Sequence, residues 1–146
     1  EFRRVLFRSD KIDAFKAHLI SVAAEKVSQT DLMPVLDLEC ELDPKQLTLS
    51  LATSLQTLEP YGAENPVPLF YTQSLKAIDF KTVGNGKHLK VTFTDEARSV
   101  VIDAIGFGLH DKLQLLYNPQ VELAFSLEIN TWLGRESPQL VLVDIK

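Results

Sequence analysis

The sequence predicts an α+β segment followed by an all-β barrel, and three observations support this order. Between residues 10 and 58, apolar residues recur at helical spacing around one short stretch that alternates like a strand. From residue 70 onward, β-rich runs follow one another and are separated by glycine-rich and Asn-Pro breaks. Between these regions, residues 60–68 hold three prolines and a glycine, which is typical of a domain boundary.

Residues 10–27 predict an amphipathic helix. Asp10 is placed to accept hydrogen bonds from its first free backbone amides, and apolar side chains recur every three or four positions to about Val27. Residues 1–9 show no capping pattern and no continuity with this helix. We therefore interpret them as a non-native leader; a genuine helix end is the alternative.

A short strand and a second helix are predicted before the boundary. Residues 36–42 alternate apolar and acidic side chains, which indicates a strand with one buried face, and the lone Cys40 is expected to be buried there. Asp43 and Pro44 are typical of a helix start, and leucines at 47, 51, 55 and 58 predict its core stripe. A single strand cannot satisfy its own edge groups. Residues 10–59 are therefore predicted to be the end of a larger domain, with residues 60–69 as a proline-rich junction.

Residues 70–146 predict a barrel of five strands. Gly84-Asn85-Gly86 supplies the positive-φ residues of a tight hairpin, and Asn118-Pro119 separates a short helix from the fourth strand. A helix between the third and fourth of five strands is typical of the Greek-key barrel called the OB-fold; an unrelated five- or six-stranded β-domain is the alternative. The predicted strands are 70–83, 88–93, 100–107, 121–129 and 139–145, with the helix at 109–117.

Composition and spacing argue against a catalytic centre in this chain. The three histidines, His18, His88 and His110, share no metal-ligand spacing, and the serines and glycines form no nucleophile elbow or phosphate loop. No apolar run approaches the ~20 residues of a membrane-spanning helix. The net charge is −5, but residues 66–146 hold eight basic and nine acidic residues, so this half can present a local basic strip.

Binding of a single nucleic-acid strand is the function that the barrel favours. Such barrels combine a cationic groove with aromatic side chains on which bases stack. Alternation turns the cations of the first hairpin toward solvent, and the turn before the last strand commonly borders the ligand groove. Two alternatives stay open: the hairpin lysines only improve solubility, or the tryptophan plugs the barrel. The candidate binding residues are Lys81, Lys87, His88, Lys90, Trp132 and Arg135.

Several segments resemble, in the same order, the carboxy-terminal motifs of RecJ-type single-stranded-DNA exonucleases of the DHH/DHHA1 class. The resemblance extends over residues 10–146. Its segments are LEPYG at 58–62, NPVPLF at 65–70, VG at 83–84 with HLK at 88–90, DAIGF at 103–107, LEINTWLGRE at 127–136, QL at 139–140 and DI at 144–145.

The resemblance implies a part of a larger enzyme. Residues 10–59 would be the end of a DHHA1-type domain and residues 70–146 its OB domain. The parent would be a cytoplasmic, monomeric bacterial enzyme that degrades single-stranded DNA from the 5′ end in recombination and repair. It would use Mn²⁺ or Mg²⁺ held by a DHH domain whose motifs are absent here. Single-stranded DNA is the implied partner, and single-stranded-DNA-binding protein is a second candidate. The alternative function is a docking module within the same nuclease.

Overall fold

The computed structural model describes residues 9–28 and 35–146. Contacts divide the chain into two compact units, residues 1–36 and residues 37–146. Apart from Ser9, the leader predicted for residues 1–9 lies outside the described residues. Within the described residues, no helix is both long and apolar enough to cross a membrane.

The first unit contains one helix, α1 (Ile12–Lys26), after a 3-10 turn, η1 (Ser9–Lys11). Asp10 lies in the 3-10 turn, one residue before Lys11, which occupies the N-cap position of α1. The helix buries none of its residues. The exposed apolar side chains are Ile12, Phe15, Leu19 and Ile20.

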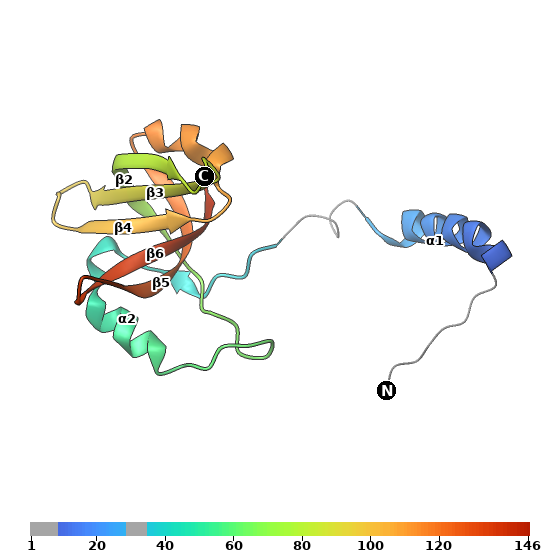
Figure 1. Cartoon of the computed structure of the whole chain (residues 1–146), viewed down its shortest axis with the longest axis horizontal. Coiled ribbons are helices and arrows are strands. Elements are labelled where there is room, and N and C mark those ends of the chain that lie inside the picture. Colours follow the sequence, from blue (N-terminus) through green and yellow to red (C-terminus); the bar gives the residue numbers. More distant parts are fainter. Residues whose placement is uncertain (1–8, 29–34) are drawn as a thin grey trace. The chain divides into compact units, whose positions relative to one another are not determined.

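Five long strands of the second unit close into a barrel (Figure 1). The described sheet has the order β1-β2-β3-β4-β6-β5, and an additional β2–β5 pairing closes it. Strands β4 and β6 pair in parallel, whereas β2–β3, β3–β4, β5–β6 and β2–β5 are antiparallel. This is the predicted OB-fold with one additional short strand. The long strands are β2 (Phe70–Val83), β3 (His88–Asp95), β4 (Val101–Gly106), β5 (Val121–Trp132) and β6 (Arg135–Ile145).

Strand β2 makes closure possible because it pairs on both sides. Its first part, from Phe70 to Leu75, pairs with β5, and its second part, from Leu75 to Val83, pairs with β3. The register shifts once in each ladder, and such irregularities bend a strand and increase its twist. The strand therefore curves around the barrel and leaves the closed sheet without a free edge there.

The barrel interior is filled by alternate residues of every long strand. In β3, Leu89, Val91 and Phe93 are at most 1% exposed, as their alternation predicts. The partner strand β4 contributes Ile102 and Ala104 in the same way. The other strands complete the core with Leu75, Ala77, Val121, Leu123, Phe125, Leu127, Leu140, Leu142 and Ile145.

Residues 37–59 pack onto this barrel, so the compact unit begins before the proline-rich junction. The predicted strand 36–42 is reduced to β1 (Cys40–Glu41), which pairs in parallel with the start of β2. Cys40 is exposed, which contradicts its predicted burial, whereas Leu42 is buried. Pairing with β2 satisfies backbone groups of this segment, and the Leu42 amide continues it by donating to the Tyr71 carbonyl at 2.9 Å, but it leaves the Cys40 side chain in solvent.

The second predicted helix is present in two pieces. Asp43 caps the 3-10 turn η2 (Pro44–Gln46), where its side chain accepts a hydrogen bond from the Lys45 amide at 2.9 Å. Helix α2 (Leu49–Gln56) then begins with Thr48 as its N-cap residue. Of the predicted leucine stripe, Leu47 is buried, Leu51 and Leu55 are half-buried, and Leu58 is exposed because it lies beyond the helix end.

The proline-rich junction folds back on the end of α2. The Asn65 side-chain amide donates to the carbonyls of Leu58 and Pro60 at 2.8 and 3.0 Å. The Tyr61 hydroxyl donates to the carbonyl of Leu55 at 2.8 Å. These bonds tie the junction to the end of α2 and to the residues that follow it.

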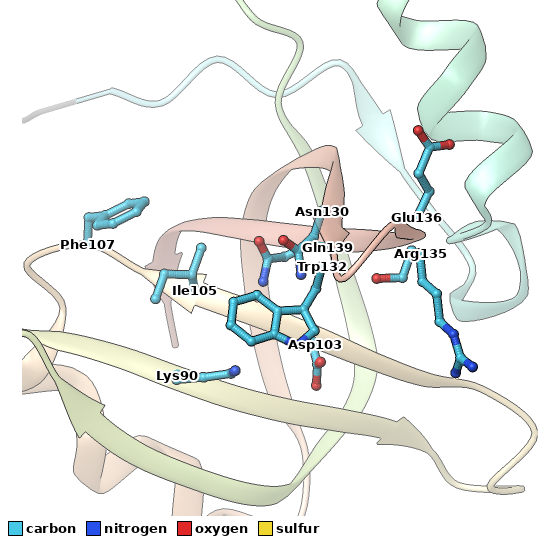
Figure 2. Close-up of a pocket in the computed structure, with 10 residues that line it drawn as sticks. Lys90, Asp103, Ile105, Phe107, Asn130, Trp132, Arg135, Glu136 and Gln139 are labelled. Atoms are coloured by element: carbon cyan, nitrogen blue, oxygen red, sulfur yellow. The ribbon is translucent and has the colours of Figure 1, made fainter.

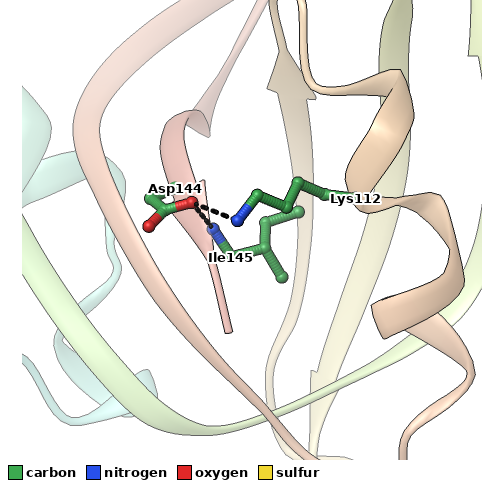
Figure 3. Close-up of polar contacts among 3 residues, drawn as sticks. All are labelled: Lys112, Asp144 and Ile145. Atoms are coloured by element: carbon green, nitrogen blue, oxygen red, sulfur yellow. Dashed lines mark hydrogen bonds and ion pairs between the residues drawn. The ribbon is translucent and has the colours of Figure 1, made fainter.

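The predicted helix between the third and fourth barrel strands is the 3-10 helix η3 (His110–Tyr117). It lies at the opposite end of the barrel from α2 (Figure 1). Lys112 of η3 forms an ion pair with Asp144 of β6 at 3.1 Å, and the Ile145 amide donates to the same carboxylate oxygen (Figure 3). Burial opposes ionisation of Asp144, but the hydrogen bonds from Lys112 and Ile145 outweigh it and lower its pKa.

Candidate nucleic-acid interface

A groove of about 680 Å³ runs across the outer face of β3, β4 and β6 and continues to the β5–β6 turn (Figure 2). This is the face of an OB barrel, with the loop between its last two strands, that commonly holds oligonucleotides. The lining residues combine two aromatic rings, two cations, two acids and three neutral polar groups. They are Lys90, Asp103, Ile105, Phe107, Asn130, Trp132, Arg135, Glu136, Ser137 and Gln139.

The floor of the groove follows from alternation along β4. Asp103 and Ile105 point outward, and Phe107 extends the same row just beyond the end of the strand. The alternate residues Ile102 and Ala104 are buried. Phe107 is 62% exposed, so its ring offers a free surface to a ligand.

The β5–β6 turn supplies the second aromatic surface. Trp132 and Arg135 are paired across a two-residue turn, and both turn residues, Leu133 and Gly134, have positive φ. That geometry matches the right-handed twist of the two strands. Trp132 is 71% exposed, which excludes a role as a plug of the barrel. Arg135 is the first residue of β6 and follows the turn directly.

Charge in the groove is balanced. Lys90 and Arg135 lie on either side of Trp132 (Figure 2). Asp103 and Glu136 line the same groove, but the Glu136 carboxylate points away from Lys90. Two cations that are offset by two acids attract a polyanion only weakly. The aromatic surfaces therefore have to contribute a large share of any strand-binding energy.

His88 positions one of these aromatic surfaces. Its Nδ1 accepts a hydrogen bond from the Gly108 amide at 3.0 Å, and its ring meets the Phe107 ring edge-on at a centroid distance of 5.4 Å. Gly84 lies directly beneath the imidazole: it has φ +59°, and a Cβ there would collide with His88 Cδ2. The first hairpin thereby holds the turn that carries Phe107.

The structure brings together three of the six predicted residues, Lys90, Trp132 and Arg135, in one groove. Lys81 and Lys87 are exposed on the β2–β3 hairpin but do not line it. His88 contacts a lining residue, Phe107. Sequence reasoning missed the lining residues of β4 because it treated residues 100–107 as one nearly continuous apolar stretch. Counting their alternation would have found Asp103, Ile105 and Phe107. Sequence reasoning also missed Asn130, Glu136, Ser137 and Gln139, because only the strand pairing brings them to this groove.

The comparisons with known proteins agree with this geometry. The family model of the RecJ OB domain matches residues 38–144. The chain belongs to the RecJ OB domain family. The match begins at residue 38, close to the start of the compact unit at residue 37 and before the predicted boundary.

Relatives of this RecJ OB domain are much longer proteins. The single-stranded-DNA-specific exonuclease RecJ of Haemophilus influenzae is 28% identical over 137 residues, which are 92% of this chain and 24% of that protein. Its Bacillus subtilis counterpart is 22% identical over 139 residues, 94% of this chain and 17% of that protein. The crystal structure of Thermus thermophilus RecJ in complex with Mn²⁺ is 28% identical with a TM-score of 0.71, and the match covers 96% of this chain and 20% of that one. The chain thus spans a quarter or less of these relatives.

The metal implied by the resemblance finds no site in the described part of this RecJ OB chain. Solved Thermus thermophilus RecJ structures are described in complex with Mn²⁺ and with Mg²⁺. Within residues 9–28 and 35–146, no three His, Cys, Asp or Glu side chains form a group that could hold a metal ion.

Proposed function

We propose that this chain is the strand-binding part of a RecJ-type 5′–3′ exonuclease and that its groove holds single-stranded DNA for a catalytic domain outside this chain. The observation that carries the proposal is the pair of exposed rings, Phe107 and Trp132, in a groove that also contains Lys90 and Arg135. Each base stacked on an aromatic ring contributes about 1–3 kcal/mol. Two such contacts offset the weak net charge of the groove.

The assembly around the strand is part of the same proposal. Bases stack on Trp132 and Phe107, while Lys90 and Arg135 contact phosphates on either side of the indole. Lys81 and Lys87 extend the cationic path along the first hairpin. The parent enzyme would act as a monomer in the bacterial cytoplasm, where its DNA substrate is found, and its Mn²⁺ or Mg²⁺ would be bound outside the described residues.

Salt dependence tests the proposal and counts the phosphate contacts. Binding of fluorescent oligothymidine, followed by anisotropy, should weaken with salt. Two phosphate contacts in the groove predict a slope of log affinity against log salt of about −1.5, and two more at the hairpin predict about −3.

Charge reversal of Lys90 and Arg135 to Glu should abolish binding. The control Lys76→Glu reverses an exposed charge of β2 outside the groove and should preserve it. Absence of binding at low salt contradicts the proposal.

A second candidate function is docking within the nuclease or to single-stranded-DNA-binding protein. The observation that favours it is the near balance of charge in the groove, where Lys90 and Arg135 are offset by Asp103 and Glu136. Exchange of Lys87, Lys90 and Arg135 for Glu separates the two functions. Unchanged DNA binding together with lost binding of the partner protein would favour docking.

A further inference from the structure

Asp103 is an unexpected residue in a groove for a polyanion. It lies on β4 and is exposed, and it lines the groove together with Trp132. Among the described residues, no Lys, Arg or His forms an ion pair with its carboxylate. A carboxylate at this position repels phosphates, so its presence weakens any binding that depends on the backbone alone. If Asp103 instead accepts hydrogen bonds from a base, its carboxylate strengthens binding.

Thr92 holds this carboxylate in place. The two residues face each other across the β3–β4 ladder, and the Thr92 hydroxyl donates to Asp103 Oδ1 at 2.8 Å. This bond restricts the rotation of the Asp103 side chain. Each carboxylate oxygen can accept two hydrogen bonds, so both oxygens still have acceptor capacity toward the groove. Asp103 is therefore an oriented acceptor.

The surroundings of Asp103 suit the edge of a base. Gln139 is its neighbour in the parallel β4–β6 ladder, and Asn130 lines the same groove, so two side-chain amides accompany the carboxylate. The Trp132 indole lies above Asp103 in Figure 2. A base stacked on the indole would present its edge to these polar groups.

We propose that Asp103, oriented by Thr92, reads the base that stacks on Trp132 and favours guanine. This inference rests on the proposed strand-binding function. Guanine presents two adjacent donors, N1–H and the N2 amino group, which match the two oxygens of a carboxylate. Thymine presents a single N–H between two carbonyl oxygens, which a carboxylate repels. Cytosine and adenine present one amino group beside an acceptor nitrogen, so they should rank between the two.

Competition binding with the whole 146-residue chain tests this preference. The probes are oligothymidines of about a dozen nucleotides, within the site size of an OB barrel, whose central base is thymine, guanine or inosine. The guanine probe should bind about 10-fold more tightly than the all-thymine probe, as expected for a good bidentate contact. Inosine lacks the N2 amino group and should fall between them. Equal affinity for the three probes overturns this inference and leaves the strand-binding proposal intact, whereas no binding of any probe overturns both.

Three variants separate base reading from simple charge repulsion. Asp103→Ala should tighten binding of the all-thymine probe and reduce the guanine preference to about 1-fold. Thr92→Val keeps the side-chain shape but removes the hydroxyl, and it should reduce the preference without changing the melting temperature by more than a few degrees. Glu136→Gln, the control at the other groove acid, should change affinity for all probes by the same factor. If Asp103→Ala strengthens binding of every probe equally, Asp103 acts only as a repelling charge and the inference is wrong.

Discussion

The two faces of the β3–β4 ladder differ although their residues alternate along the same strands. The inner face holds Leu89, Val91 and Phe93, which are almost completely removed from water. The outer face holds Lys90 and Asp103, which remain exposed and line the groove. Burial stabilises the fold in proportion to the apolar area removed from water. Successive residues of a strand therefore have different roles: those that face inward stabilise the barrel, and those that face outward are available to bind a ligand.

The strongest test of this difference removes the largest inner side chain of β3. Phe93 is fully buried, so Phe93→Ala should lower the free energy of unfolding by about 3–5 kcal/mol through lost burial and a remaining cavity. Urea denaturation followed by circular dichroism measures this. The outward neighbour Lys90→Ala is the control and should change stability by less than about 0.5 kcal/mol. Similar losses in both variants would show that the two faces are not energetically distinct.

The converse test removes an aromatic ring from the outer face. Trp132 is 71% exposed, so Trp132→Ala should leave the melting temperature almost unchanged. It should weaken oligothymidine binding by about 1–3 kcal/mol, the contribution of one stacked base. Trp132→Phe retains a ring and should recover most of the affinity in the same anisotropy assay. A variant that binds normally but melts earlier would assign Trp132 to the structural face.

Leu133 is an apolar residue that does not stabilise the fold by burial. It is 87% exposed and has φ +50°, a conformation that is costly for a residue with a large side chain. Leu133→Asn should therefore raise the free energy of unfolding by about 0.5–1 kcal/mol, because asparagine tolerates this geometry. Chemical denaturation measures the change. A loss of stability would mean that the leucine has a contact that its exposure does not reveal.

Whereas Leu133 is an apolar residue that is exposed, Asp95, at the end of β3, is a charged residue that is buried. The Ser99 hydroxyl donates to it at 2.6 Å and the Val100 amide at 2.8 Å; these bonds lower its pKa, although burial opposes the effect. A lowered folded-state pKa means that its contribution to stability is present above the unfolded value of about 3.9 and is lost as pH falls through the folded value.

Of the effects predicted for these variants, the effect of replacing Asp95 should be the smallest. At neutral pH, Asp95→Asn should melt below the unmodified chain, because the amide is uncharged and keeps only one of the two oxygens that accept from Ser99 and Val100. The difference in melting temperature should shrink as pH falls below the unfolded pKa of about 3.9 and through the lower folded pKa of Asp95. Melting curves between pH 3 and 7 in the same buffer series provide the measurement. A difference that grows toward acid pH would contradict the lowered pKa.

Much of the barrel could be predicted from the sequence because each of its strands has one solvent-exposed face and one buried face. The alternation in residues 88–93 and 121–129 matches the observed burial, and Gly84-Asn85-Gly86 forms the expected turn. Prediction failed where the burial of a segment depended on packing against a distant part of the chain. Residues 36–42 alternate equally well, but Cys40 is exposed although it pairs with β2, and of the predicted inner face only Leu42 is buried.

The groove was predictable only in part, for the same reason. Lys90, Trp132 and Arg135 could be identified as exposed residues of a hairpin and a turn, although Lys90 lies more than forty residues from the other two in the chain. Nothing local indicated that Gln139 would lie beside Asp103, because that neighbourhood depends on the parallel β4–β6 pairing. Long-range ladders of this kind follow from closure of the barrel and leave no spacing signal in the sequence.

The sequence by itself determined which residues of each strand face inward, where the hairpins turn, and that the chain resembles a RecJ OB domain. These are local properties, since side-chain polarity and backbone preference act over a few residues. Only the tertiary structure decided that residues 37–59 pack on the barrel, that His88 supports Phe107, and which side chains share the groove. Those relations join segments that are distant in sequence, and they arise because the closed sheet satisfies its backbone hydrogen bonds and buries its core in a single arrangement.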